Sequence, residues 1–134
     1  MLRKLALFSS VLAVLVVLGF AGSALAGNPH FVTVNTTVEG DTVTVQGKEA
    51  GLGDEEQVHI VVSGLAACIN PGGNDPEAAN KESFSAAGDF PVQNGKALFS
   101  LELIATFQPS CSPPMSVQWS NITVTDTTHG ITFP

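Results

Sequence analysis

Hydrophobic and polar residues alternate along most of this chain, and a period of two is typical of β-strands with one buried face. The run at 57–66 is apolar on both faces near its middle, which indicates a central strand. The runs at 31–38 and 42–48 flank a Glu-Gly-Asp turn and predict a hairpin. In all, the alternating runs cover residues 31–38, 42–48, 57–66, 83–90, 97–103, 117–124 and 131–133.

Turn-forming and strand-breaking residues separate these runs. Gln93-Asn94-Gly95 predicts a tight turn, because Asn-Gly tolerates positive φ. The proline-rich stretch 108–114 is excluded from a strand interior, since proline has no backbone donor. The apolar phase slips between Trp119 and Ile122, which predicts a bulge around 120–121. We therefore predict an all-β fold, an antiparallel immunoglobulin-like β-sandwich of about seven strands. A small closed barrel is the alternative.

The N-terminal region has the pattern of a secretory signal peptide. A basic start precedes the almost wholly apolar run 5–20, and Ala24-Leu25-Ala26 supplies a small-residue cleavage site. An uncleaved membrane anchor is the alternative, because the run is long enough to span a bilayer with some tilt. We expect a signal peptide at 1–26, a single β-sandwich domain at 27–134, and a secreted, extracellular protein.

The chain is strongly acidic. It has 12 acids against 5 lysines and arginines, for a formal net charge of −7, and loss of the signal would remove Arg3 and Lys4 as well. Such a surface repels phosphate backbones and anionic lipid. We therefore expect no nucleic-acid partner and no membrane association after signal cleavage. The expected protein is a monomer, and its partner is an unknown extracellular ligand or protein.

The two cysteines favour pairing in an exported chain. A Cys68–Cys111 disulfide would close a loop of about 40 residues and stabilise the fold by roughly 4 kcal/mol on the chain-entropy model. Two free thiols are the alternative. Since the third and sixth strands of an immunoglobulin-like sandwich are antiparallel neighbours, a register set by the two cysteines would place Ile60 near Trp119.

The segment ACINPGGNDPEAANK, residues 67–81, is rich in turn-forming and polar residues. Its part from Asp75 to Asn80 has the signature of one capped helical turn. One interpretation is a self-satisfied loop held by the disulfide. The other is a ligand site, because loops on rigid sandwiches often carry binding. The candidate ligand-binding residues are Asn70, Asn74, Asp75, Glu77, Asn80 and Lys81.

The remaining chemistry-bearing residues show no catalytic or metal-binding pattern. The acidic triplet 54–56 indicates a solvated turn, and His30, His59 and His129 have no ligand spacing. There is no G-x-S-x-G elbow, and no carboxylate pair is singled out for glycoside hydrolysis. Calcium at the 67–81 loop is an alternative whose usual spacing is not met. We expect no catalytic residue, no metal, no cofactor and no enzyme activity.

Two further patterns concern the surface. Carbohydrate sites use aromatic platforms, whereas Trp119 lies in apolar phase and is expected in the core. Asn35 and Asn121 each begin an Asn-x-Thr glycosylation sequence. A signal peptide of this type fits a bacterial source equally well, so these sequences leave glycosylation open.

Three segments form a recognisable set: KEAGLGD (48–54), ACINPGG…PEAANKE (67–82) and ITVTDTTHG (122–130). Together they resemble a family of small secreted bacterial β-sandwich proteins of uncharacterised function, from whose pattern Ile69 and Pro71 depart. The resemblance covers essentially all of 27–134. It implies a common β-rich fold and an extracytoplasmic location, and no catalytic residues. A fold-level analogy to enediyne-antibiotic carrier apoproteins, which use two disulfides, supports only the sandwich.

These observations favour a secreted, non-enzymatic protein, namely a binding or cell-surface interaction module with 69–82 as its contact region. A structural or matrix protein that assembles through exposed strand edges is the alternative. A small-ligand carrier or a hydrolase is a further alternative.

Overall fold

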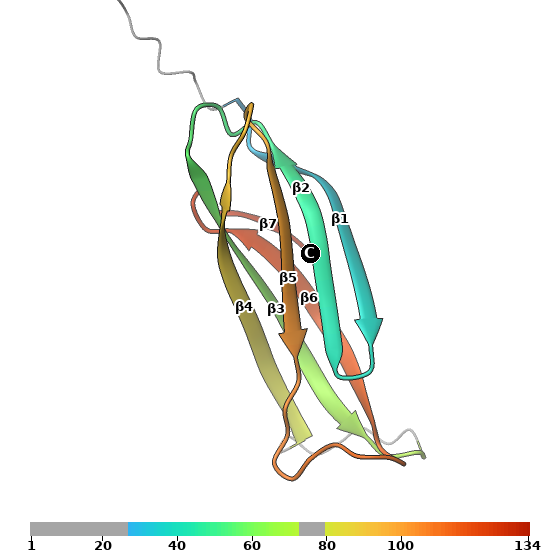
Figure 1. Ribbon diagram of the computed structural model, residues 1–134. Coiled ribbons are helices and arrows are strands. Elements are labelled where there is room, and N and C mark those ends of the chain that lie inside the picture. Colours follow the sequence, from blue (N-terminus) through green and yellow to red (C-terminus); the bar gives the residue numbers. More distant parts are fainter. Residues whose placement is uncertain (1–26, 73–79) are drawn as a thin grey trace, which may run out of the picture.

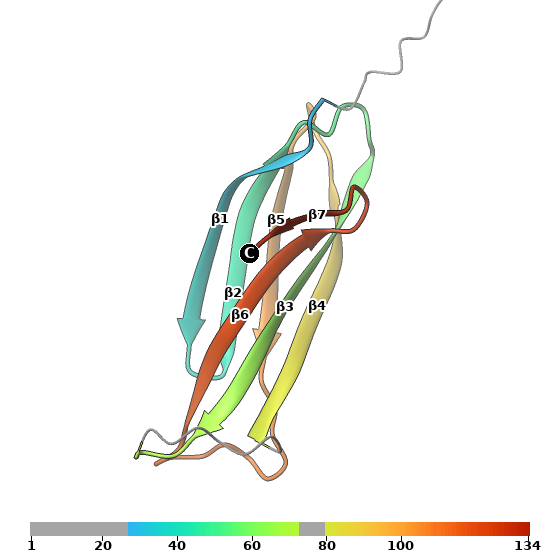
Figure 2. The same ribbon diagram turned by 180° about the vertical axis from the view of Figure 1, so that it is seen from behind.

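The structure is a computed structural model that describes residues 27–72 and 80–134. Seven strands form two antiparallel sheets packed face to face (Figures 1 and 2). The chain also contains a Cys68–Cys111 disulfide. The described residues form no helix, and so none that is long and apolar enough to cross a membrane. The predicted all-β sandwich is confirmed. The predicted signal peptide lies outside the described residues.

The strands are β1 (His30–Glu39), β2 (Thr42–Ala50), β3 (Gln57–Ile69), β4 (Lys81–Pro91), β5 (Ala97–Ile104), β6 (Ser116–Asp126) and β7 (Ile131–Phe133). One sheet has the order β1-β2-β5, and the other has the order β4-β3-β6-β7. The immunoglobulin constant topology places the fourth strand beside the fifth. Here β4 pairs with β3 and also packs against β5, which closes that flank of the sandwich.

The alternation seen in the sequence builds the core. Along β3, the even-numbered side chains from Val58 to Cys68 face inward and are buried, while the odd-numbered ones are half-exposed or exposed. The buried side chains of β3 pack against inward side chains of β2 and β5, such as Val45 and Leu103. Burying a side chain of this size contributes about 1.5–3 kcal/mol. The main cluster comprises Val43, Val45, Leu52, Val58, Ile60, Val62, Ala97, Phe99, Leu103 and Val124.

The predicted turn and bulge are both present. Asn94 and Gly95 have φ of 54° and 74°, as the tight turn between β4 and β5 requires. Asn121 has φ of 52°, and the pairing of β6 with β3 shifts opposite Gly64. A Cβ on Gly64 would lie 3.2 Å from the ring of Trp119, so the glycine at this position lets the large side chain pack closely on the β3 backbone.

The predicted register of the third and sixth strands is wrong, although the two strands are antiparallel neighbours. Ile60 pairs with Asp126 and not with Trp119. The cause is that β3 extends three residues beyond its predicted end, so Cys68 lies inside the strand. Cys111 lies in the connection between β5 and β6. The disulfide therefore ties a strand to a loop and does not set the strand register.

The two ends of the sandwich are closed in different ways. The disulfide lies at the end where β3 stops and β6 starts. The β2–β3 connection and the β4–β5 turn lie together at the opposite end, and the β6–β7 turn also lies toward that end (Figure 1). This second end has no covalent bridge among the described residues. It contains the two buried acidic side chains of the core, Glu49 and Asp126.

Candidate functional site

The predicted ligand-binding residues are only partly within the described chain. Asn70 and Asn80 are exposed at the disulfide end. Lys81 is exposed at the start of β4 and lines a groove of about 330 Å³ on the outer face of β3 and β6. Asn74, Asp75 and Glu77 lie outside the described residues. The structure thus confirms the Cys68–Cys111 anchor of this segment, and the segment's ligand-binding role stays a prediction.

Two acidic side chains lie inside the sandwich, at the end away from the disulfide. Glu49 of β2 and Asp126 of β6 are both 0% exposed. Glu49 occupies an inward position in the same alternation as Val43 and Val45, and Asp126 is the last residue of β6. Because β2 and β6 belong to different sheets, the two carboxyl groups approach each other across the interior.

His129, in the turn between β6 and β7, holds Asp126. Its backbone N–H donates to Oδ1 of Asp126 at 3.1 Å, and its ring Nδ1 lies 2.5 Å from Oδ2. The other ring nitrogen, Nε2, lies 2.7 Å from Oε1 of Glu55 in the β2–β3 connection. An ionised carboxylate can only accept, so with both acids ionised each ring nitrogen donates a hydrogen and the ring is an imidazolium.

The electrostatics of this cluster follow from burial and from these contacts. Burial alone would lower the pKa of His129, but the hydrogen bonds to Asp126 and Glu55 raise it above its usual value of 6.5. Burial would raise the pKa of Asp126, but hydrogen bonds from a protonated Glu49 and from His129 outweigh it, so this pKa lies below 3.8. Asp126 and His129 thus form an ion pair.

Glu49 is the member of the cluster in which both side-chain oxygens are unsatisfied. Neither carboxylate oxygen of its buried side chain has a hydrogen-bond donor. Burial, and then the neighbouring Asp126, raise the pKa of Glu49 to about 8. Any hydrogen bond between the two carboxyl groups therefore has to use a proton on Glu49 itself. In the absence of that proton, the site needs another positive charge.

We name the set of Glu49, Glu55, Asp126 and His129 the buried acid–histidine cluster. Oxygen or nitrogen atoms of Glu49, Asp126 and His129 all lie within 4.8 Å of one another. The sequence analysis missed this grouping, because its members come from three separated segments. One signal was available, namely that an acid occupies an inward position in both β2 and β6.

The expectations for the other acids and histidines are met only in part. Asp54 and Glu56 are exposed, as a solvated turn requires, but Glu55 is only half-exposed because it contacts His129. His59 lies on the outer face of β3, with Nδ1 2.7 Å from Oδ1 of Asp89 on the neighbouring β4. This exposed pair is separate from the cluster.

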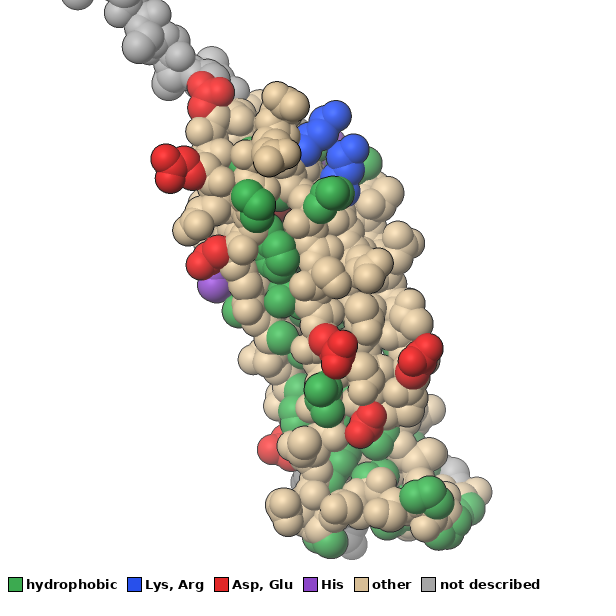
Figure 3. All heavy atoms as spheres, viewed as in Figure 1, with side chains coloured by type: hydrophobic (Ala, Val, Ile, Leu, Met, Phe, Trp, Pro, Cys, Tyr) green, Lys and Arg blue, Asp and Glu red, His purple; other side chains and the backbone are tan. Residues whose placement is uncertain are grey.

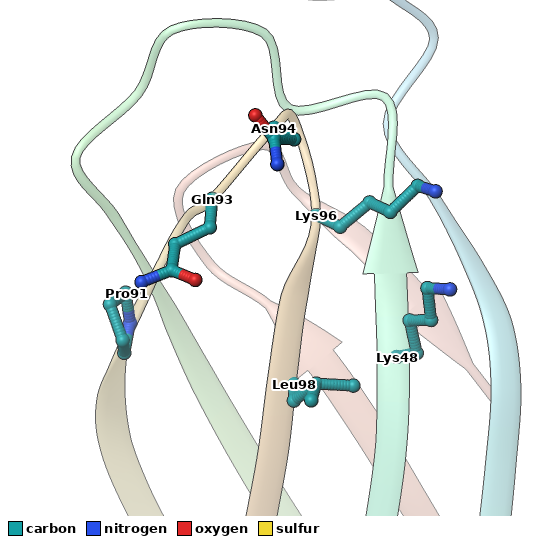
Figure 4. Close-up of a pocket in the computed structure, with 6 residues that line it drawn as sticks. All are labelled: Lys48, Pro91, Gln93, Asn94, Lys96 and Leu98. Carbon is teal, nitrogen blue, oxygen red and sulfur yellow. The ribbon is translucent and has the colours of Figure 1, made fainter.

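A pocket of about 400 Å³ lies on the outer surface, near the same end of the sandwich (Figure 4). Leu98 of β5 lies at its floor and is 73% exposed. Lys48 of β2 pairs with Leu98 in the sheet, and Lys96 precedes β5. The space-filling view shows lysine side chains gathered near this end, while acidic side chains are scattered over the whole face, this end included (Figure 3). The lining residues are Lys48, Pro91, Gln93, Asn94, Lys96 and Leu98.

Comparison of the chain with known protein families, curated proteins and solved structures finds no match. The resemblance to small secreted bacterial proteins therefore stays a prediction. The segments 48–54 and 122–130 that contribute to it do meet in space, since they contain Glu49, Asp126 and His129.

Proposed function

We propose that this protein is an exported, non-enzymatic interaction module that binds an extracellular partner through the pocket around Leu98. The disulfide is consistent with an oxidising compartment outside the cytoplasm. The observation that carries the proposal is that Leu98 is 73% exposed. In this very acidic protein it lies beside two lysines, Lys48 on the neighbouring strand and Lys96 two residues earlier. Exposed apolar side chains rimmed by charge are typical of interaction surfaces.

The partner's chemistry follows from the pocket. Leu98 offers an apolar contact, and Lys48 and Lys96 offer two positive charges beside it. A partner with an apolar side chain flanked by carboxylates is complementary to this surface. The pocket belongs to strands and a tight turn, so it is held in place by the sandwich before any partner binds.

The test is retention of proteins from culture supernatant on immobilised protein. We expect the wild type to retain a partner that Leu98→Glu does not retain, because the new carboxylate repels acids and removes the apolar contact. Ile104→Glu is the matched control, since Ile104 is 53% exposed on the same strand and lies outside the pocket. Equal retention by all three proteins, or no retention above an empty column, contradicts the proposal.

The assembly alternative rests on a different observation. β1 is the edge strand of its sheet, and its Val32 and Val38 are 49% and 51% exposed. Exposed apolar edge strands pair readily with other chains. Light scattering after size exclusion distinguishes assembly from the interaction module. A molar mass that increases with protein concentration in the wild type, but not in Val38→Lys, supports assembly. A constant monomer mass supports the interaction module.

A further inference from the structure

We propose that the buried acid–histidine cluster binds a divalent cation of the zinc class, with Glu49, Asp126 and Nδ1 of His129 as ligands and Glu55 as the outer partner of the histidine. This site is distinct from the pocket around Leu98, and the proposal does not rest on the proposed interaction function. Four steps carry it: the unmet charge of Glu49, the ligand set, the orientation of the histidine, and the position in the fold.

The first step is the charge balance. Glu49 is 0% exposed, points into the cluster, and has no donor for either oxygen. A buried carboxylate without a partner is strongly unfavourable. Among the described residues, the cation that contacts these acids is the His129 ring, which already has Asp126 on one nitrogen and Glu55 on the other. The imidazolium is thus already paired on both sides, and Glu49 is left with either its own proton or a further cation as a partner. A divalent cation that displaces this proton satisfies the buried carboxylate.

The second step is the ligand set. The three ligand atoms lie within 4.8 Å of one another. Zn²⁺ takes nitrogen and carboxylate oxygen at roughly 2.0–2.2 Å. The Glu49 carboxylate would therefore move inward, and Nδ1 of His129 and Oδ2 of Asp126, now 2.5 Å apart, would move apart to admit the ion. An imidazole nitrogen suits zinc and related transition metals. Ca²⁺ and Mg²⁺ prefer sites made of oxygen ligands only. Tetrahedral coordination leaves one position for water.

The third step is the orientation of His129. Its Nε2–H donates to Oε1 of Glu55 at 2.7 Å, which fixes the ring with Nδ1 toward the two buried acids. A carboxylate behind a histidine is the usual outer partner of a metal ligand, since it sets the ring orientation and increases its basicity. On binding, the cation takes the place of the Nδ1 proton now shared with Asp126 and of the proton on Glu49, and both protons leave to solvent.

The fourth step is the place of the site in the fold. Its ligands come from β2 in one sheet and from β6 and the β6–β7 turn in the other. A bound ion would thus join the two sheets at the end opposite the disulfide. Access is available from outside, because the side chains of His129 and Glu55 are 15% and 33% exposed. Glu55 also lines an open pocket of about 390 Å³.

The experiment is a zinc titration of the chelator-treated, dialysed protein, followed by calorimetry and by thermal unfolding. We expect one Zn²⁺ per chain and a Tm that rises with zinc concentration, because an ion that binds only the folded state stabilises it. Ca²⁺ should bind about tenfold more weakly or worse, as a site with a nitrogen ligand implies. Proton release should accompany zinc binding and vary with the buffer's ionisation enthalpy.

Two variants locate the site. Glu49→Gln keeps the shape of the side chain and removes its charge, and we expect zinc affinity to fall about tenfold or more. His129→Asn removes the nitrogen ligand, together with its contacts to Asp126 and Glu55, and alters no strand residue. It should give a similar loss of zinc affinity, which covers the case that the β2 variant fails to fold. Glu56→Gln is the matched control, because Glu56 is an exposed acid of the same connection as Glu55, and it should bind zinc like the wild type.

The outcomes that overturn the proposal are specific. Equal zinc affinity in the wild type and both site variants would mean that zinc binds only exposed groups such as His59 and Asp89. No zinc binding to the wild type at millimolar concentration would mean that a proton on Glu49, rather than a metal ion, satisfies the cluster.

Discussion

Glu49 and Asp126 belong to different sheets, yet their carboxyl groups lie within 4.8 Å of a common histidine atom and of each other in the interior of the sandwich. Strand alternation places both side chains inward, and His129 and Glu55 then close the cluster from the connecting segments. The sandwich is therefore joined covalently at one end and by charged groups at the other. This asymmetry has consequences for stability that can be measured.

Without added metal, stability should fall as the pH rises from about 4.5 to about 8. The Glu49 carboxyl has a pKa of about 8 in the folded state and 4.5 ordinarily, so the unfolded chain loses a proton in this range that the folded chain keeps. The free energy of unfolding then decreases with pH. The raised pKa of His129 adds a loss of the same sign above pH 6.5, and urea unfolding at a series of pH values measures the sum.

Glu49→Gln is the control for this pH dependence. The glutamine amide does not titrate, and its N–H can donate to Asp126 at every pH, so the decline between pH 4.5 and 8 should become much shallower. Asp126 affects the pH dependence of stability in the opposite direction. Its lowered pKa stabilises the folded state above about pH 3.8, and this stabilisation is lost as the pH falls below that value. A wild type whose stability is constant or increases from pH 5 to 8 contradicts this account of the cluster.

The disulfide should contribute strongly to stability. Cys68 and Cys111 are separated by 43 positions, so the bridge restricts a long segment of the unfolded chain. Replacing both cysteines by serine should lower the free energy of unfolding by about 2–4 kcal/mol in urea denaturation. Wild-type protein treated with a reductant should show a similar loss. A change within about 0.5 kcal/mol, as surface substitutions give, would count against this role.

Two leucines of β5 test which face of the strand is buried. Leu103 is 1% exposed and Leu98 is 73% exposed. We expect Leu103→Ala to lower the free energy of unfolding by about 2–5 kcal/mol, since it leaves a cavity in the core. Leu98→Ala should change it by no more than about 0.5 kcal/mol. Similar costs for the two substitutions would mean that the orientation of β5 is wrong.

Local patterns were sufficient to predict the strands and turns. Most of the strands alternate between apolar and polar residues, and Asn94-Gly95 has the positive φ values that its turn requires. The bulge near Asn121 was also predictable, because a slip in phase is visible along a single strand. These features depend only on neighbours in the sequence.

The strand register and the buried cluster depend on contacts between distant segments, and there the sequence was insufficient. Cys68 continues the alternation of β3, but the apolar residues around it do not show where the strand stops. Asp126 and His129 are close in sequence, whereas Glu49 joins them only because two sheets pack together. Spacing rules for metal ligands therefore do not detect this set.

Anomalous diffraction from crystals grown with Zn²⁺ tests the central claim most directly. We predict one strong peak at the zinc edge, about 2.0–2.2 Å from a carboxylate oxygen of Glu49, a carboxylate oxygen of Asp126 and Nδ1 of His129. Peaks at exposed acids alone would contradict the claim. So would a cluster without a peak, in which a Glu49 oxygen lies at hydrogen-bonding distance from Asp126.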